Sequence, residues 1–131
     1  MSVSIKNFTR RPSDGRRVFS KVANEILTGW DISLVFVGSA KARALNKELR
    51  NKEYTPNVLS YTLGDKSGEI FICPKEAEKQ ASLFGLSRRA FVLSLFIHGL
   101  LHIKGWAHGA KMDKCEQTLL LRYGSTHSDR H

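Results

Sequence analysis

Three histidines in the C-terminal third of the sequence have the residue type and spacing of a metal site. His98 and His102 are four residues apart, so on a helix both imidazoles lie on one face, one turn apart. Gly105 follows, and a glycine with positive φ ends a helix and lets the chain turn back, so that His108 reaches the same point. Three converging neutral imidazoles predict an open metal site with a fourth position for water.

The alternative for this trio is three structural histidines in the core. The spacing H-x-x-x-H-x-x-G-x-x-H favours the metal site, because it matches the ligand frame of the metzincin proteases. Zinc suits imidazole ligands, as do copper, iron and nickel, so the spacing leaves the metal open. The protease base, the glutamate of H-E-x-x-H, is replaced by Gly99. A hydrolase would therefore use a base from elsewhere, by elimination Asp65 or Glu69, or a metal-acidified water.

The elements that position these residues can be predicted from apolar periodicity. The segment with the histidines begins at the cap Ser87 and is apolar nearly all round, which predicts the central buried helix. Strands are predicted at residues 3–5, 33–37, 57–62 and 69–72, with a glycine-rich turn at 64–68. Further helices are predicted between residues 12 and 29 and at 74–84. Two more are marked by apolar residues: the first by Ala42, Leu45 and Leu49, and the second by Met112, Leu119, Leu120 and Leu121.

These elements predict one small α/β (α+β) domain over residues 1–131. We expect a mixed sheet of roughly four strands with about five helices packed on it, and a polar, frayed tail at 125–131. Cys73 and Cys115 suggest no disulfide framework. No apolar run has the length of a signal peptide or a membrane span, so a reducing cytoplasmic setting and no membrane partner are expected.

The charge balance indicates an anionic partner. Lys and Arg number 21 against 12 Asp and Glu, which gives a net charge of +9 and a pI near 9.9. Nucleic acid is the favoured partner, a membrane surface stays open, and solubility alone is the simpler explanation.

Residues 98–108, HGLLHIKGWAH, resemble the signature H-G-x-L-H-L-x-G-Y-D-H of the YbeY family. The proteins of this family are bacterial metal-dependent endoribonucleases of ribosomal RNA maturation. Residues 45–50, LNKELR, resemble its L-N-x-x-Y-R. Residues 55–61, TPNVLSY, resemble its T-D-V-L-S-F with one extra residue, and residues 68–70, GEI, resemble its G-D-I. Together the blocks cover about the last two thirds of the chain.

The resemblance implies a function and a set of site residues. His98, His102 and His108 match the ligands of one Zn²⁺, and Arg50 matches a cleft arginine that would contact phosphate in the transition state. The implied activity is single-strand-specific RNA cleavage in 16S rRNA 3′-end maturation and ribosome quality control. The implied partners are ribosomal RNA, the small ribosomal subunit, and ribosomal proteins or a GTPase.

Three departures from the family pattern bear on activity. Ala107 replaces the acidic residue before the third histidine, so a carboxylate that would orient a ligand or a water at the metal is lost from that position. Asn57 replaces the aspartate of the strand block, and Leu49 replaces the aromatic residue before Arg50. The chain is also short for the family, particularly after the metal loop.

Other candidates have both a functional and a structural interpretation. Ser60 would contact a phosphate or a metal-bound water, or merely face a polar layer. Trp106 would stack on a base or cap the helix core. Arg50 and Lys47, without the resemblance, would belong to a solvated basic face. The remaining candidates for an RNA track, with salt-sensitive binding, are Arg10, Arg11, Arg16, Arg17, Arg88 and Arg89.

Two alternative functions stay open. One is a zinc metalloprotease, suggested by the metzincin-like ligand spacing and opposed by Gly99. The other is an RNA- or ribosome-binding assembly factor, in which the metal is structural and the net charge supplies binding.

Overall fold

The mixed sheet predicted from the sequence is present. The computed structural model describes residues 2–10 and 15–128, with side chains for 3–10 and 15–124. The strands are β1 (Ser2–Asn7), β2 (Asp31–Phe36), β3 (Val58–Gly64) and β4 (Ser67–Ile72), in the order β1-β2-β4-β3. Strands β1, β2 and β4 are parallel, and β3 pairs antiparallel with β4. Strand β3 is therefore an edge strand.

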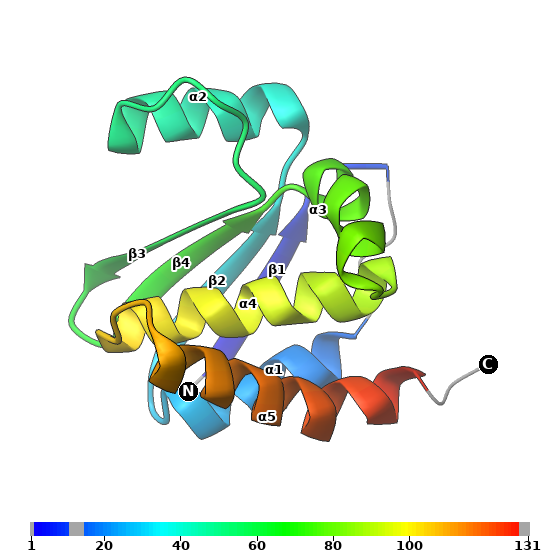
Figure 1. The fold of residues 1–131 in the computed structure, drawn as a ribbon. Helices are drawn as coiled ribbons and strands as arrows, with labels where there is room; N and C mark the ends of the chain where they lie inside the picture. The colour runs from blue at the N-terminus through cyan, green and yellow to red at the C-terminus, as the bar shows by residue number, and fades with distance from the viewer. Residues whose placement is uncertain (1, 11–14, 129–131) are drawn as a thin grey trace.

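Five helices surround the sheet. They are α1 (Arg16–Ile26), α2 (Ser39–Arg50), α3 (Pro74–Ala81), α4 (Arg88–Lys104) and α5 (Ala110–Ser128), with a 3₁₀ turn, η1 (Ser82–Phe84), after α3. Helix α4 crosses one face of the sheet, α5 packs on α4, and α2 lies on the opposite face (Figure 1). The predicted fold class, a small α/β domain with a mixed four-stranded sheet and a central helix carrying the histidines, is confirmed.

The main core lies between α4 and the sheet. Phe96, Ile97 and Leu100 are completely buried in it. Two glycines allow close approach, because a Cβ at Gly99 would lie 3.1 Å from Ile70 Cδ1 and a Cβ at Gly68 would lie 2.9 Å from Ile103 Cδ1. This contact holds the histidine-bearing end of α4 directly against β4.

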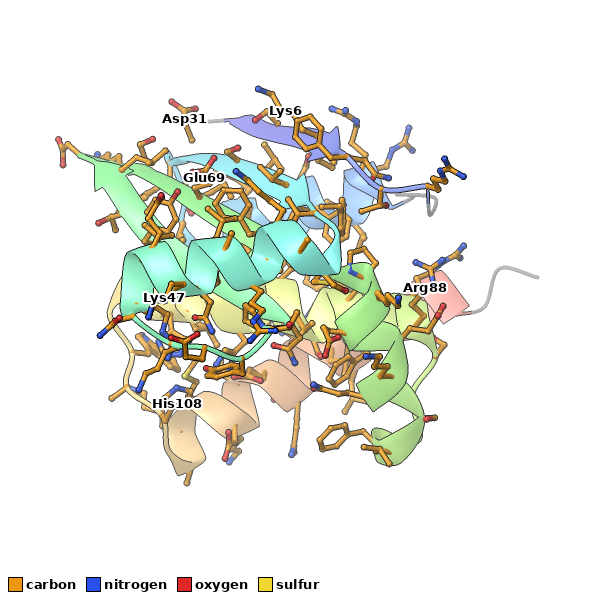
Figure 2. The ribbon with its side chains drawn as sticks, turned by 90° about the horizontal axis from the view of Figure 1, so that it is seen from above. Lys6, Asp31, Lys47, Glu69, Arg88 and His108 are labelled. Atoms are coloured by element: carbon orange, nitrogen blue, oxygen red, sulfur yellow. The ribbon has the colours of Figure 1, made fainter. Side chains whose placement is uncertain are left out.

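The opposite face of the sheet has a smaller apolar core and a polar part. Val35, Val37, Ala42 and Cys73 form the apolar cluster under α2. Farther along the strands, Glu69 accepts a hydrogen bond from the Tyr61 hydroxyl and one from Ser33 Oγ at 3.4 Å. Glu69 lies well away from His108 (Figure 2).

Two members of the apolar sets that marked α2 and α5 lie outside the core. Leu49 is 46% exposed, and Asn46 is buried in its place, because the Asn46 amide ties the following loop by donating to the Tyr54 carbonyl at 2.9 Å. Leu121 is 72% exposed, because α5 turns the stripe containing Met112 and Leu119 toward α4.

Some boundaries also differ from the prediction. Strand β2 begins at Asp31, and α5 continues to Ser128, into the segment predicted to be frayed. Residues 129–131 lie outside the described part of the chain, as do residues 11–14 of the predicted first helix start. Cys73 and Cys115 are both free thiols, as expected.

We also compared the helices with the length and apolarity that a membrane span requires. Among the described residues, no single helix meets both requirements. The segments Pro74–Phe84 and Arg88–Lys104 meet them only as a pair, and the two are bent by 106°.

Candidate metal centre

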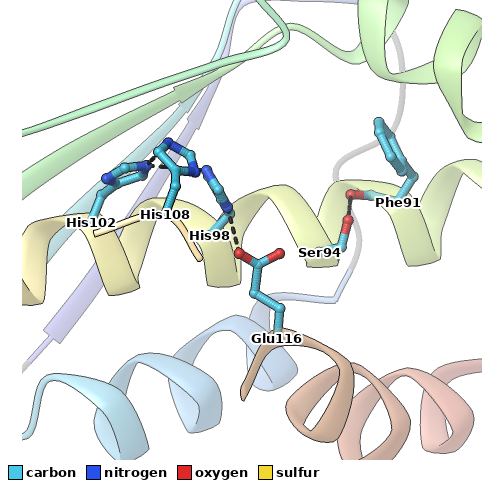
Figure 3. Close-up of polar contacts among 6 residues, drawn as sticks. All are labelled: Phe91, Ser94, His98, His102, His108 and Glu116. Atoms are coloured by element: carbon cyan, nitrogen blue, oxygen red, sulfur yellow. Dashed lines mark hydrogen bonds and ion pairs between the residues drawn. The ribbon is translucent and has the colours of Figure 1, made fainter. Parts of the chain in front are cut away.

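Local sequence signals place the histidines as predicted. Ser87 caps α4 by accepting a hydrogen bond from the Ala90 N–H at 3.1 Å. Gly105 ends the helix in the left-handed region, with φ +102, and its N–H bonds back to the last turn. The chain then reverses and brings His108 beside His98 and His102 (Figure 3).

The three side chains direct one nitrogen each toward a common point. His102 Nε2 lies 3.1 Å from His98 Nε2 and 3.0 Å from His108 Nε2. Tetrahedral zinc at about 2.0–2.1 Å from each nitrogen would separate the nitrogens by about 3.3 Å, so the donor set fits such an ion closely. Among the described residues, His98, His102 and His108 are the only ones that form this group of possible metal ligands. A fourth coordination position is therefore left for water or substrate.

A carboxylate from α5 supports this centre. His98 Nδ1 lies 2.5 Å from Glu116 Oε2, and both side chains are largely buried. Because a carboxylate there accepts the Nδ1–H, the lone pair of His98 remains on Nε2, which faces the metal position. Sequence analysis missed Glu116 and expected reduced support because of Ala107. Only the α4–α5 contact distinguishes Glu116 from its acidic neighbour Asp113.

The environment keeps His102 in the neutral form that binds metals. Burial lowers the pKa of His102, and the neighbouring His98 and His108 lower it further. Glu116 acts in the opposite direction, and the charge of Arg50 adds a smaller lowering effect. Arg50 is therefore within electrostatic reach of the metal centre.

The metal centre opens into a cleft of about 790 Å³. The cleft is bounded by the histidines and Ile103 on one side and by Arg50, the loop before β3 and β3 itself on the other. Gln80 of α3 also lines it. Among the described residues that line the cleft, none is Asp or Glu, so its walls favour an anionic ligand.

Arg50 lines the cleft from the end of α2 and is held there by local hydrogen bonds. Its Nη1 donates to the Tyr54 hydroxyl at 3.1 Å and to Asn46 Oδ1 at 3.5 Å. Ser60 also lines the cleft. It pairs with Ile70, which contacts Gly99, so its side chain faces the α4 side of the sheet.

Neither position 99 nor the carboxylates Asp65 and Glu69 can supply the general base of a hydrolase at this metal centre. Gly99 faces Ile70 in the sheet, so there is no room for a glutamate at that position. Glu69 lies on the opposite face, bonded to Tyr61, and neither Asp65 nor Glu69 lines the cleft.

The other predicted RNA-contact residues lie outside the cleft lining. Lys47 pairs with Glu53 at 2.5 Å, close to Arg50 on α2. Arg88, which pairs with Glu78 at 3.7 Å, and Arg89 begin α4, roughly 20 Å along the helix from His102. Exposed side chains near the N-terminus are Arg10, Arg16 and Arg17, and Arg11 lies outside the described residues.

Trp106 belongs to a different groove. Lys111 Nζ lies 4.7 Å from the centroid of its ring, and the ring packs against the main core. Trp106 lines a pocket of about 320 Å³ between α1 and α5, together with Lys114 and Arg122.

Comparisons with known proteins agree with this geometry. The model of the family "Endoribonuclease YbeY" matches residues 5–123. The endoribonuclease YbeY of Neisseria gonorrhoeae is 32% identical over 122 residues, covering 82% of this chain and 71% of that protein. That of Mycoplasmopsis synoviae is 32% identical over 113 residues, covering 79% and 70%. The solution structure of TM1509 from Thermotoga maritima shares the fold, with a TM-score of 0.69, 20% identity and coverage of 98% and 93%. The chain belongs to the endoribonuclease YbeY family.

Proposed function

We propose that this protein is a zinc-dependent endoribonuclease that hydrolyses phosphodiester bonds in single-stranded RNA. One observation carries the proposal: three imidazole nitrogens converge in the cleft that Arg50 also lines, with those of His98 and His108 at 3.1 and 3.0 Å from His102 Nε2. The family matches and the absence of carboxylates from the described cleft lining support an RNA substrate.

The residues of the cleft have distinct tasks in this reaction. A zinc ion bound by His98, His102 and His108 would supply a Lewis acid and acidify a water. Arg50 donates N–H groups to the phosphate and offsets the negative charge that develops on it. Glu116 maintains the orientation of His98. Ser60 offers a hydroxyl to the phosphate from β3.

We further infer that the natural substrate is ribosomal RNA in the cytoplasm. The 3′ end of 16S rRNA and defective small subunits are the expected targets, with ribosomal proteins or a GTPase as recruiting partners. The family relatives and the net charge of +9 support a polyanionic substrate of this kind.

The proposal is tested with purified protein and a short single-stranded RNA that contains the 16S 3′ region. We expect zinc-loaded protein to cut it, while EDTA or His102→Ala abolishes cutting and zinc binding, with Lys114→Ala as an exposed basic control. Cutting that survives both treatments comes from a contaminant and contradicts the proposal. Uncut RNA, bound with a steep salt dependence to zinc-containing protein, would instead support an assembly factor.

A further inference from the structure

The cleft carries an anchored aromatic ring outside the group of histidines. Tyr54 is 54% exposed and lines the cleft. Its hydroxyl accepts a hydrogen bond from Arg50 Nη1 at 3.1 Å, and its carbonyl accepts one from Asn46 at 2.9 Å. Because both the hydroxyl and the backbone of Tyr54 are bonded, its exposed ring is already ordered before a ligand arrives. Rings of this kind bind single-stranded nucleic acid by stacking on bases.

Two amides line the same cleft. Asn57 Nδ2 donates to Gln80 Oε1 at 2.7 Å, and both half-buried side chains line the cleft. The backbone at Asn57 is fixed, because its carbonyl accepts the Cys73 N–H at 2.9 Å. The hydrogen bond between the amides leaves the Asn57 oxygen, its second N–H and the Gln80 amide hydrogens available. A donor beside an acceptor is the arrangement with which Asn and Gln bind the edges of bases.

The strand register places Asn57 relative to the metal centre. Ser60 pairs with Ile70, which packs on Gly99, so Ser60 is level with the turn of α4 that carries His98. Asn57 precedes Ser60 by three residues, which corresponds to about 10 Å along an extended strand. A base at Asn57 therefore belongs to a nucleotide near the one at the metal centre, and both lie within a single cleft.

We propose that Tyr54, Asn57 and Gln80 form a nucleobase subsite. It holds the base of the nucleotide next to the cleaved phosphodiester, with the ring stacked on Tyr54 and an edge bonded to the two amides. The subsite gives the protein a base preference at that position. This inference rests on the proposed function and extends it, because nothing in the metal centre itself distinguishes one base from another.

The test uses zinc-loaded protein and single-stranded RNA oligonucleotides that differ in one base at a time on each side of the cleaved bond. At one position we expect cleavage rates to differ roughly tenfold between the best and worst base. Asn57→Leu should remove this difference, and the isosteric Asn57→Asp should change which base is preferred. Asn24→Leu, the same substitution at an exposed position of α1, is the control and should leave the preference unchanged.

Stacking is tested separately from edge recognition. Tyr54→Leu should weaken binding of every oligonucleotide by about tenfold, while Tyr54→Phe keeps the ring and most of the binding. Zinc content and the thermal unfolding midpoint, measured for every variant, show whether it is folded. Gln80→Leu provides a second route to the amide pair if an Asn57 variant does not fold.

Two results would overturn the subsite. One is equal cleavage of all four bases at every position, and the other is a preference that persists in both folded Asn57→Leu and folded Gln80→Leu. The proposed function fails differently, with no cleavage of any RNA by the zinc-loaded wild type. In that case binding of the same oligonucleotides, measured by fluorescence anisotropy, still tests the subsite: base-dependent binding lost in Asn57→Leu supports it, and base-independent binding contradicts it.

Discussion

The two walls of the cleft are built in different ways. On the α4 wall, His98 and His102 project from a helix whose other faces are buried, and Gly99 brings this helix into contact with Ile70. On the opposite wall, named the loop wall after the segment before β3, Arg50 at the end of α2 and Tyr54 are exposed and are joined by a side-chain hydrogen bond. Packing in the core therefore sets the metal position, whereas polar contacts at the surface set the substrate groups.

This difference separates the expected effects of substitutions. Changes on the α4 wall should alter metal affinity or the free energy of unfolding. Changes on the loop wall should alter turnover and RNA binding while the metal stays bound.

Arg50→Ala should cause the largest loss of turnover on the loop wall. We expect cleavage to fall by about 100-fold or more, because a charge-stabilising donor is removed from the phosphate. Zinc affinity, measured by competition with a chelator, should stay the same. Lys52→Ala, a neighbouring exposed cation outside the cleft lining, serves as the control. Loss of zinc from Arg50→Ala would show that the two walls are not independent.

Glu116→Ala should produce the converse result on the α4 wall. Zinc affinity should fall by about 10–100-fold, because His98 loses the acceptor that orients its ring. Asp113→Ala removes the same charge from the first turn of α5 and should leave zinc affinity almost unchanged. Equal losses in the two variants would mean that net charge on α5, rather than the contact with His98, determines affinity.

Gly99→Val should destabilise the fold by about 1–3 kcal/mol, because the added atoms collide with Ile70 in a packed core. The measurement is the free energy of unfolding in urea. At Gly64, where an added Cβ meets nothing within 4 Å, the same substitution should have a much smaller effect. If both variants unfold at the same urea concentration, the close approach of α4 to β4 contributes little to stability.

The smallest expected effect is at Tyr61. Burial raises its pKa to about 12, and the hydrogen bond to Glu69 contributes. Because the folded pKa lies above the usual value of about 10, this contribution to stability is complete below pH 10 and is lost as the pH rises toward 12. In Tyr61→Phe, the free energy of unfolding should fall less steeply between pH 10 and pH 12 than it does in the wild type. Because the pKa of Tyr123 is also raised, Tyr61 is followed as the difference in tyrosinate absorbance between the wild type and Tyr61→Phe. Titration of Tyr61 near pH 10 would contradict the assignment.

The sequence by itself determined the elements and the ligand trio. Ser87 and Gly105 bound α4 because capping and positive φ are local properties, and the spacing of His98, His102 and His108 follows from helix geometry and a single turn. Apolar periodicity predicted the strands because it too is a local property of the sequence. The resemblance pointed to Arg50, which local patterns alone would have assigned to a solvated face.

Only the tertiary structure decided which other residues join the site. Glu116 reaches His98 across the α4–α5 contact, and Gln80 reaches Asn57 from α3. How the other elements pack also leaves Leu49 exposed and places Glu69 on the face of the sheet away from the cleft. These outcomes depend on which helix faces meet and how closely they approach, and contacts between segments distant in the chain leave no periodic signal in the sequence.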